Sequence, residues 1–372
     1  GPPGGLPPDG NGGGGGGKKE EEEDDDDYYD EEEEEDTYEK RIWKLKKNEM
    51  PSIPEEQIIS LINYLRGDTL GNGGTSIVVK AIHYMDQSIK YAAKIFVPNM
   101  DDVFPGLTYS EYIEMLKKNI RREVENHLMI SGPNMKLRHP SITNSIGFAI
   151  KRFRNSPNHN PVLLLELMSY GTLRDVIDRL IKKREEEKVR KNEKDEKDRK
   201  DDRWNETTRL ICIYGIASTM AYLHAKGIIH RDLKLENILV DQYLYPKLAD
   251  FGLAIKTSEA ENEKHTIGTE RYMAPEILRK NEYSVKSDVY AFGILVYELM
   301  MEEIFKVEGS FMFRIALKKE RPQIPETIPT CYQNLITSCW DDDPGNCPTF
   351  VDILQILKTD DFVVPKEIED FF

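Results

Sequence analysis

The sequence predicts an α+β fold built in two unequal parts. Short β-rich runs separated by turn-forming stretches come first, at residues 64–70, 76–84 and 88–96. After Gly171 the apolar residues recur at helical spacing instead. With 372 residues the chain can bury one large core or two moderate ones, because single domains usually hold about 100 to 200 residues.

The first 40 residues are expected to form a disordered tail. Residues 1–36 combine glycine and proline with 16 acidic residues and two lysines, a net charge of −14 out of −16 for the chain. Such a segment cannot bury enough apolar surface to offset its conformational entropy. An acidic interaction tail or a phosphotyrosine site at Tyr28-Tyr29 is the alternative to a solvated tail, which we favour. The rest of the chain is nearly neutral, so its bulk charge does not indicate nucleic-acid binding.

Residues 64–96 are predicted to form three consecutive antiparallel strands with a glycine-rich turn between the first two. Gly71, Gly73 and Gly74 stand near that turn, where glycine lets backbone N–H groups approach phosphate oxygens. A strand rather than a helix follows, which excludes a Rossmann dinucleotide turn. A plain hairpin without a ligand is the alternative.

The third strand and the helix after it offer a buried ion pair. Lys94 lies in the apolar stretch YAAKIF, where an ammonium group is costly unless an anion meets it. A surface lysine on an edge strand is the alternative. Residues 109–130 have apolar side chains at helical spacing, and Glu123 on this helix offers the counter-charge. Residues 162–167 are typical of a buried strand.

The second part contains a highly charged segment. Residues 182–203 hold 20 charged side chains among 22, eleven basic and nine acidic. A segment without an apolar face forms either a solvated single helix or a flexible insert, and we favour a solvated insert. Nucleic-acid binding is disfavoured because the charges nearly cancel.

Cysteine usage and hydropathy indicate a soluble protein of a reducing compartment, which we expect to be the cytoplasm. None of the four cysteines forms a C-x-x-C pair, which argues against a disulfide framework and a zinc site. The longest apolar stretch, residues 291–297, is too short to span a bilayer, so we expect no membrane insertion. The chain begins with Gly1, which leaves open whether its N-terminus is truncated.

Several polar motifs follow one another between residues 65 and 357. His230-Arg231-Asp232 is followed by Lys234 and Asn237, and Asp250-Phe251-Gly252 comes 13 residues later. GTERYMAPE at 268–276 and SDVYAFG at 287–293 continue the series. Together these motifs resemble the catalytic loop and metal-binding segment of eukaryotic protein kinases. The resemblance implies a two-lobed protein-kinase-like fold over 64–358: a small antiparallel β-rich N-lobe with an αC helix (64–168) and a larger, mainly helical C-lobe (169–358). A tail over 359–372 would follow.

The resemblance also implies a nucleotide site that takes ATP and Mg²⁺. Lys94 would hold the α- and β-phosphates and be oriented by Glu123, while the hinge at 166–168 would bind adenine with Leu165 as gatekeeper. The implied nucleotide-binding residues are Leu70, Gly71, Gly73, Val78, Lys94, Glu123, Glu166 and Met168.

Four polar residues would carry the chemistry. Asp232 would orient the acceptor hydroxyl and accept its proton, with Lys234 near the transferred phosphate. Asn237 and Asp250 would bind the magnesium ions that neutralise developing charge. The implied reaction is transfer of the γ-phosphoryl group of ATP to protein substrates in signal transduction.

The acceptor class is expected to be serine or threonine. Lys234 and Gly268-Thr269 resemble the serine/threonine enzymes, and the later motifs are closest to the tyrosine-kinase-like branch. Thr269 is expected to contact the catalytic loop. Arg231 beside Asp232 implies that a phosphate on the activation segment, at Thr257, Ser258 or Thr266, pairs with that arginine and orders the segment. The oligomeric state is left open.

Three positions depart from the family pattern. Ser76 replaces the third glycine of the phosphate loop, a change expected to have a modest effect. Cys347 replaces the arginine that usually pairs with the glutamate of APE, here Glu276. Ser145 stands where a bulky apolar residue usually completes a stack with His127, His230 and Phe251, and is expected to loosen the active conformation.

Two alternatives to an active enzyme stay open. One is a catalytically weak or silent kinase-like signalling scaffold, against which the intact Lys94, Glu123, Asp232, Asn237 and Asp250 argue. The other is an adaptor that acts through the acidic residues 18–36.

Overall fold

The computed structural model describes residues 45–73, 75–97, 108–132, 139–190, 203–263 and 265–372. The chain divides into two compact units, Gly1–Arg41 and Ile42–Phe372, and the description below concerns the second. The predicted acidic tail and residues 191–202 of the charged segment lie outside the described residues.

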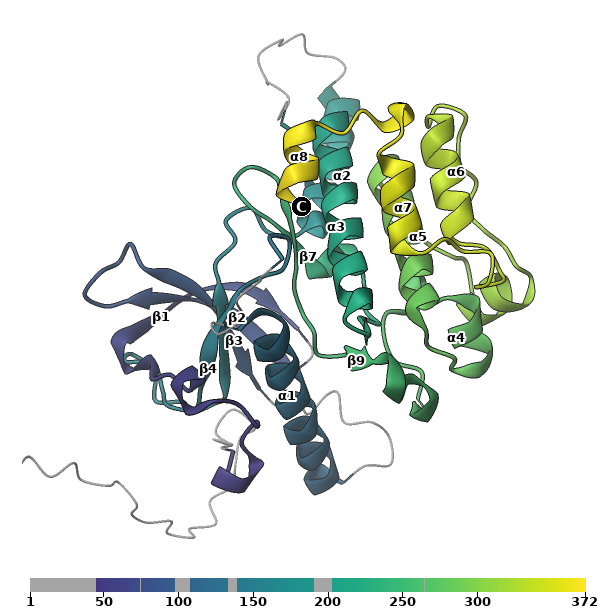
Figure 1. The fold of residues 1–372 in the computed structure, drawn as a ribbon. Coiled ribbons are helices and arrows are strands. Elements are labelled where there is room, and N and C mark those ends of the chain that lie inside the picture. The colour runs from purple at the N-terminus through teal and green to yellow at the C-terminus, as the bar shows by residue number, and fades with distance from the viewer. Residues whose placement is uncertain (1–44, 74, 98–107, 133–138, 191–202, 264) are drawn as a thin grey trace, which may run out of the picture. The chain divides into compact units, whose positions relative to one another are not determined.

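A five-stranded antiparallel sheet forms the first part (Figure 1); four of its strands match the predicted runs, and the strand Ser145–Ala149 was not predicted. Its strands stand in the order β1-β2-β3-β5-β4. They comprise β1 (Tyr64–Asn72), β2 (Ser76–His83), β3 (Lys90–Phe96), β4 (Ser145–Ala149) and β5 (Val162–Glu166). The register places Gly71 opposite Val78 and Val78 opposite Lys94, so these three residues lie in one row across β1, β2 and β3.

Helix α1 (Tyr109–Ser131) packs against this sheet, one residue longer than the periodicity predicts. Thr108 caps its N-terminus, because the Thr108 side chain accepts a hydrogen bond from the Glu111 backbone N–H. Its buried face meets Phe96, Phe148 and Leu163 of the sheet in one apolar core. That face comprises Tyr112, Leu116, Ile120, Val124 and Leu128. Burial of this face fixes the rotation of α1 about its axis, and hence the direction of its polar side chains.

The second part is mainly helical, as predicted, and shares one large core. Its helices are α2 (Leu173–Arg190), α3 (Glu206–Ala225), α4 (Pro275–Lys280), α5 (Val285–Met301), α6 (Thr330–Cys339), α7 (Phe350–Leu357) and α8 (Lys366–Phe371), with a π-helical turn η9 (Met312–Leu317). Two short antiparallel pairs organise the polar loops. They join β6 (Ile228–Ile229) to β9 (Ile255–Lys256) and β7 (Ile238–Val240) to β8 (Pro246–Leu248).

Short 3-10 helices connect these elements. They are η2 (Lys47–Glu49), η3 (Glu55–Gln57), η4 (Leu61–Asn63), η6 (Leu235–Asn237), η7 (Thr257–Asn262), η8 (Glu270–Tyr272) and η10 (Asp360–Phe362). The C-terminal residues 359–372 also pack: the Ser218 hydroxyl of α3 donates to the Phe372 carbonyl at 2.8 Å, and Phe362 and Ile368 are buried. The charged segment begins as the last turns of α2.

Residues 45–53, which we call the brace, lie against α1. Lys117 Nζ is 2.7 Å from Glu49 Oε1, and the Ser52 backbone N–H donates to Glu125 Oε1 at 2.6 Å. Leu45 is buried in the same apolar core as α1. No element is predicted for this stretch from the sequence, and the structure adds it.

All four cysteines are free thiols. Cys212, Cys339 and Cys347 are buried, and Cys331 is partly exposed. Burial raises the pKa of each thiol, to about 11 for Cys347. Among the described residues, no helix is long and apolar enough to cross a membrane.

Candidate active site

Lys94 on β3 forms the centre of a three-residue charge cluster. Its ammonium group makes a close ion pair with Glu123 of α1, and lies 3.5 Å from Asp250 Oδ2 in the loop after β8. Burial alone would lower the pKa of Lys94, but the two carboxylates more than offset it and hold that pKa above its usual value. Lys94 is therefore charged. Burial raises the pKa of Glu123 to about 7, although the Lys94 ammonium group favours its ionised form.

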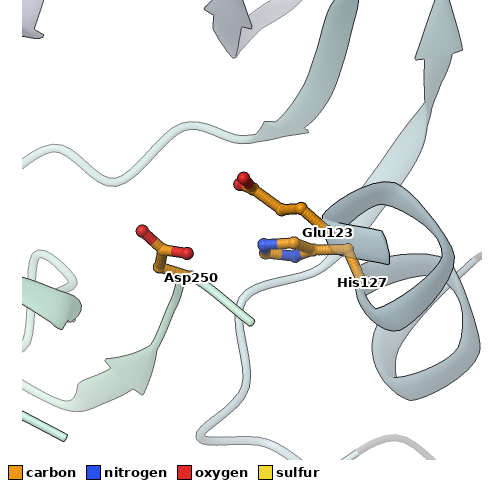
Figure 2. A group of neighbouring side chains, drawn as sticks. All are labelled: Glu123, His127 and Asp250. Carbon is orange, nitrogen blue, oxygen red and sulfur yellow. The ribbon is translucent and has the colours of Figure 1, made fainter. Parts of the chain in front are cut away.

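His127 completes this cluster one helical turn after Glu123. Figure 2 shows Glu123, His127 and Asp250 converging from α1 and from the loop after β8. Their ligand atoms lie within 4.8 Å of one another, a spacing that a metal ion could bridge. Lys94 already pairs with both carboxylates, and His127 Nε2 accepts a hydrogen bond from the Phe251 backbone N–H at 3.2 Å. The described geometry thus favours an ammonium group over a metal ion between these carboxylates.

Asp232, Lys234 and Asn237 meet in the loop between β6 and β7. Lys234 Nζ is 2.7 Å from Asp232 Oδ2, and Asn237 Nδ2 donates to Asp232 Oδ2 at 3.0 Å and to the Asp232 carbonyl at 2.8 Å. Thr269 contacts this loop as expected: its hydroxyl donates to Asp232 Oδ1 at 2.9 Å and accepts from Lys234 at 2.8 Å. Both Asp232 oxygens are therefore held by neighbours, which fixes the direction of the carboxylate.

Asp288 of α5 holds the backbone of the same loop, a role that the sequence analysis missed. Its two carboxylate oxygens accept from the backbone N–H groups of His230 and Arg231, each at 2.9 Å. His224 adds a contact at 2.8 Å. Arg231 has a φ of 69°, a left-handed conformation that these bonds stabilise. The sequence contains a feature that could have indicated this role, because Asp288 is the one acidic residue in the first turn of the apolar helix α5.

The glycine-rich turn joins β1 to β2. Gly73 donates its backbone N–H to the Ser76 carbonyl at 2.7 Å, which closes the turn. At Gly71 no atom lies within 4 Å of where a Cβ would stand, whereas at Gly73 the Ser76 hydroxyl oxygen would be 3.3 Å away. Leu70 is exposed next to this turn and Val78 is half-buried below it. Gly74 lies outside the described residues.

The predicted hinge follows β5. Leu165 is buried, and the Glu166 carboxylate accepts from Lys247 at 2.8 Å and from the Asn144 backbone N–H at 2.7 Å. The Glu166 side chain is thus engaged with protein groups, and Met168 follows it half-buried. The Glu166 backbone N–H also donates to the Asn144 carbonyl, at 3.0 Å.

Phe251 lies between two imidazole rings. The ring centroids of His127 and His230 are 5.0 and 5.5 Å from that of Phe251, both in edge-to-face geometry. Ser145 does not stack. Its hydroxyl lies 2.8 Å from the Ser131 hydroxyl and donates to the His127 carbonyl at 3.3 Å. A buried hydrogen-bonded serine pair therefore occupies the place where a bulky side chain was missing, and the expected loosening stays a prediction.

Glu276 has only a weak side-chain partner. The Ser287 hydroxyl lies 3.5 Å from Glu276 Oε1, and burial raises the pKa of this carboxyl group. The Cys347 thiol lies 3.3 Å from the Cys339 carbonyl, and burial together with the nearby Glu276 carboxylate raises its pKa. The loss of the arginine at position 347 is thus offset in part by a tendency of Glu276 toward its neutral form.

Arg231 is paired with a carboxylate. Its Nη1 lies 2.5 Å from Glu263 Oε2, and its Nε donates to the Leu253 carbonyl at 2.6 Å. Its Nη2 is buried without a hydrogen-bond partner among the described residues. Thr257, Ser258 and Thr266 are exposed on the same segment.

A cavity of about 730 Å³ lies apart from this cluster, lined by α2 and by residues 303–322. Arg174 on its wall pairs with Glu236 of the catalytic loop at 3.2 Å.

Comparison with known proteins identifies what the chain resembles. A family model described as protein tyrosine and serine/threonine kinase matches residues 108–357, more than half of the chain. Serine/threonine/tyrosine-protein kinase HT1 of Arabidopsis thaliana is 36% identical over 156 residues, 41% of this chain and 40% of that protein. A probable serine/threonine-protein kinase of Dictyostelium discoideum is 29% identical over 291 residues, 75% of this chain and 20% of that protein.

A third relative is the dual specificity protein kinase shkE of Dictyostelium discoideum, 42% identical over 139 residues, which cover 36% of this chain and 20% of that protein. The matched region spans less than half the length of each of these three relatives.

Proposed function

The chain belongs to the protein tyrosine and serine/threonine kinase family, and from this membership we propose that it transfers the γ-phosphoryl group of ATP to serine or threonine hydroxyls of protein substrates. One observation carries the proposal. Lys94 of the sheet and Asp250 of the helical part lie 3.5 Å apart, close enough to act on one nucleotide triphosphate.

Nucleotide binding is assigned to the sheet side of this cluster. Lys94 would hold the α- and β-phosphates and Glu123 would orient it, since the two side chains are already paired. The row Gly71, Val78 and Lys94 supports a path for the triphosphate along β1 to β3. Leu70 and Gly73 would border it, and backbone groups at Glu166 and Met168 would receive the base.

Mg²⁺ fits the oxygen donors of the helical part. Burial raises the pKa of the Asp250 carboxyl, but Lys94 and His127 more than offset this, so its pKa lies below the usual value and Asp250 is ionised. Asn237 donates through Nδ2 to Asp232, which leaves its amide oxygen as the end that would face a cation. Hard oxygen ligands of this kind are those that Mg²⁺ prefers, and the bound ion would neutralise charge on the phosphates.

The acceptor site is assigned to Asp232. Its carboxylate is held by Asn237, Lys234 and Thr269, so it is oriented to accept a proton from a hydroxyl group. Lys234 would lie beside the transferred phosphate. Serine and threonine are favoured by Lys234 and Thr269, whereas the names of two relatives include tyrosine or dual specificity, so tyrosine phosphorylation is a possible outcome of the test below.

Regulation is proposed to act through Arg231. The Arg231 guanidinium is buried and pairs with Glu263 in the unmodified chain, so a phosphate on Thr257, Ser258 or Thr266 would pair with Arg231 by replacing Glu263. The four free thiols support a reducing compartment, and we propose the cytoplasm.

The weakly partnered Glu276 favours the second candidate function, a catalytically weak kinase-like scaffold.

The test is incubation of the purified chain with Mg-ATP and a mixture of protein substrates, followed by mapping of phosphorylated residues by mass spectrometry. Asp232→Asn should lower turnover by about 10²- to 10⁴-fold while ATP binding is largely kept. Lys94→Met should remove most activity, and Lys90→Met, an exposed lysine on the same strand, should not.

Either variant phosphorylating as fast as the parent would refute the role given to that residue. A folded parent chain that binds ATP but transfers no phosphate would instead support the scaffold.

A further inference from the structure

Three side chains of α1 hold the backbone of residues 250–254, the segment that carries Asp250. Arg122 Nε donates to the Gly252 carbonyl at 3.1 Å. Asn126 Nδ2 donates to the carbonyls of Phe251 and Ala254, each at 2.9 Å. The Phe251 backbone N–H donates to His127 Nε2 at 3.2 Å. Four hydrogen bonds thus join one helix to one short loop.

These residues share α1 with Glu123. Positions four apart lie on the same side of a helix, so Arg122 and Asn126 are neighbours, and His127 stands one turn after Glu123. Glu123 holds the Lys94 ammonium group while Arg122, Asn126 and His127 hold the loop that carries Asp250. One rigid element therefore sets both ends of the 3.5 Å contact between Lys94 and Asp250.

His127 is suited to this task only as a hydrogen-bond acceptor. Nε2 accepts a hydrogen bond from the Phe251 backbone N–H, so the ring carries its proton on Nδ1. Nδ1 is buried without a hydrogen-bond partner among the described residues. An apolar side chain beside the Phe251 ring would avoid that cost. The benefit that offsets it is the bond to the Phe251 N–H.

We propose that Asn126 and His127 are positioning residues that fix Asp250 for metal binding through the backbone of residues 251–254. The proposal rests on the assignment of Asp250 as a Mg²⁺ ligand. Neither residue touches a reacting group; each acts through the loop. The arrangement depends on a polar pair at 126 and 127 on the loop-facing side of α1.

The first test measures the loop directly by hydrogen–deuterium exchange of the nucleotide-free chain. Asn126→Leu removes two bonds at nearly constant volume, and Asn119→Leu makes the same change at an exposed position of the same helix. His127→Leu removes the acceptor, whereas His127→Gln retains one. We expect backbone exchange in residues 250–254 to rise about tenfold in Asn126→Leu and His127→Leu. Asn119→Leu should match the parent, and His127→Gln should restore most of the protection.

The second test measures ADP affinity by calorimetry with and without Mg²⁺. The Mg²⁺-dependent gain in affinity should fall about tenfold in Asn126→Leu and His127→Leu, while metal-free binding stays unchanged.

Unchanged exchange in both variants, or equal behaviour of His127→Gln and His127→Leu, would overturn the proposal. The exchange measurement is made without nucleotide, so it does not depend on catalysis. A chain that transfers no phosphate would refute the proposed function, but the exchange data would still test whether Asn126 and His127 hold the loop. Increased exchange with an unchanged Mg²⁺ effect would show that the loop is held but Asp250 is not a ligand.

Discussion

Glu298 illustrates how burial sets the chemistry of a single residue. Its carboxyl group is fully buried in α5, where the Tyr272 hydroxyl donates to it, the Phe305 backbone N–H donates at 2.9 Å, and Arg271 Nε lies 3.2 Å away. Burial raises its pKa from 4.5 to about 7 despite these partners. The native chain therefore keeps a proton on Glu298 at pH values where the unfolded chain has lost it.

This difference predicts a pH dependence of stability. Below the unfolded pKa of 4.5 the contribution is fully present, and it is lost as pH rises to the folded pKa of about 7. The free energy of unfolding should fall by about 1.4 kcal/mol per pH unit in that window on account of this group. Glu298→Gln, which cannot titrate, should give a flatter curve in urea unfolding across the same range. A parent-minus-variant difference that is independent of pH would contradict the assignment.

Helix α1 makes contacts with other elements on three of its sides. The brace meets Lys117 and Glu125 on one side, Glu123 reaches Lys94, and Asn126 faces the loop that carries Asp250. The brace thus contributes to the same geometry from outside the catalytic residues. Its removal would free α1 on the side where Leu45 now covers the apolar core.

The brace contact predicts a contrast between two adjacent lysines. Lys117 is largely buried between Glu49 and Glu114, whereas Lys118 is exposed. Lys117→Met should lower the free energy of unfolding by about 1 kcal/mol, because it leaves Glu49 without its partner. Lys118→Met should cost less than about 0.5 kcal/mol. Denaturant unfolding of the two variants checks this, and equal losses would mean that the brace pair is not stabilising.

Periodicity explains why some elements could be predicted and others not. The run of apolar residues from Tyr112 to Leu128 predicts α1 to within one residue, and the alternating strands predict the sheet. The brace contains a single 3-10 turn, Lys47–Glu49, followed by Pro51, and its apolar residues have no period, so no pattern marks it. The partners of Asn126 are backbone carbonyls more than 120 residues away, and a backbone partner leaves no trace in side-chain spacing.

The two parts of the molecule share an apolar core through Ile130 and Ile142, and polar contacts also link them. Lys94 reaches Asp250 from the sheet, and α1 reaches the loop after β8 through Asn126. Arg231 ties the catalytic loop to the segment that follows through Glu263 and the Leu253 carbonyl. Regulation of the whole molecule is therefore expected to act on the anion that Arg231 binds.

Removal of phosphate should lower activity without abolishing it. Complete phosphatase treatment should reduce turnover, because under the proposed regulation a phosphate on the activation segment would pair with Arg231, and residual activity should persist through Glu263. Glu263→Gln should make the dephosphorylated chain markedly less active than the dephosphorylated parent. Turnover measured before and after treatment, with mass spectrometry to verify removal, decides between these outcomes. Unchanged turnover after complete dephosphorylation would refute the proposed regulation.

The four thiols have a practical consequence for spectroscopy. Because burial holds each pKa above its usual value, little thiolate forms near neutral pH, and maleimide dyes should react slowly with the unaltered chain. Met85 in the sheet part and Val363 in the helical part are 75% and 80% exposed. Cysteines introduced at these two positions could carry a donor and an acceptor fluorophore with little background labelling. Energy transfer between them would then follow, molecule by molecule, how far apart the two parts move when nucleotide is added.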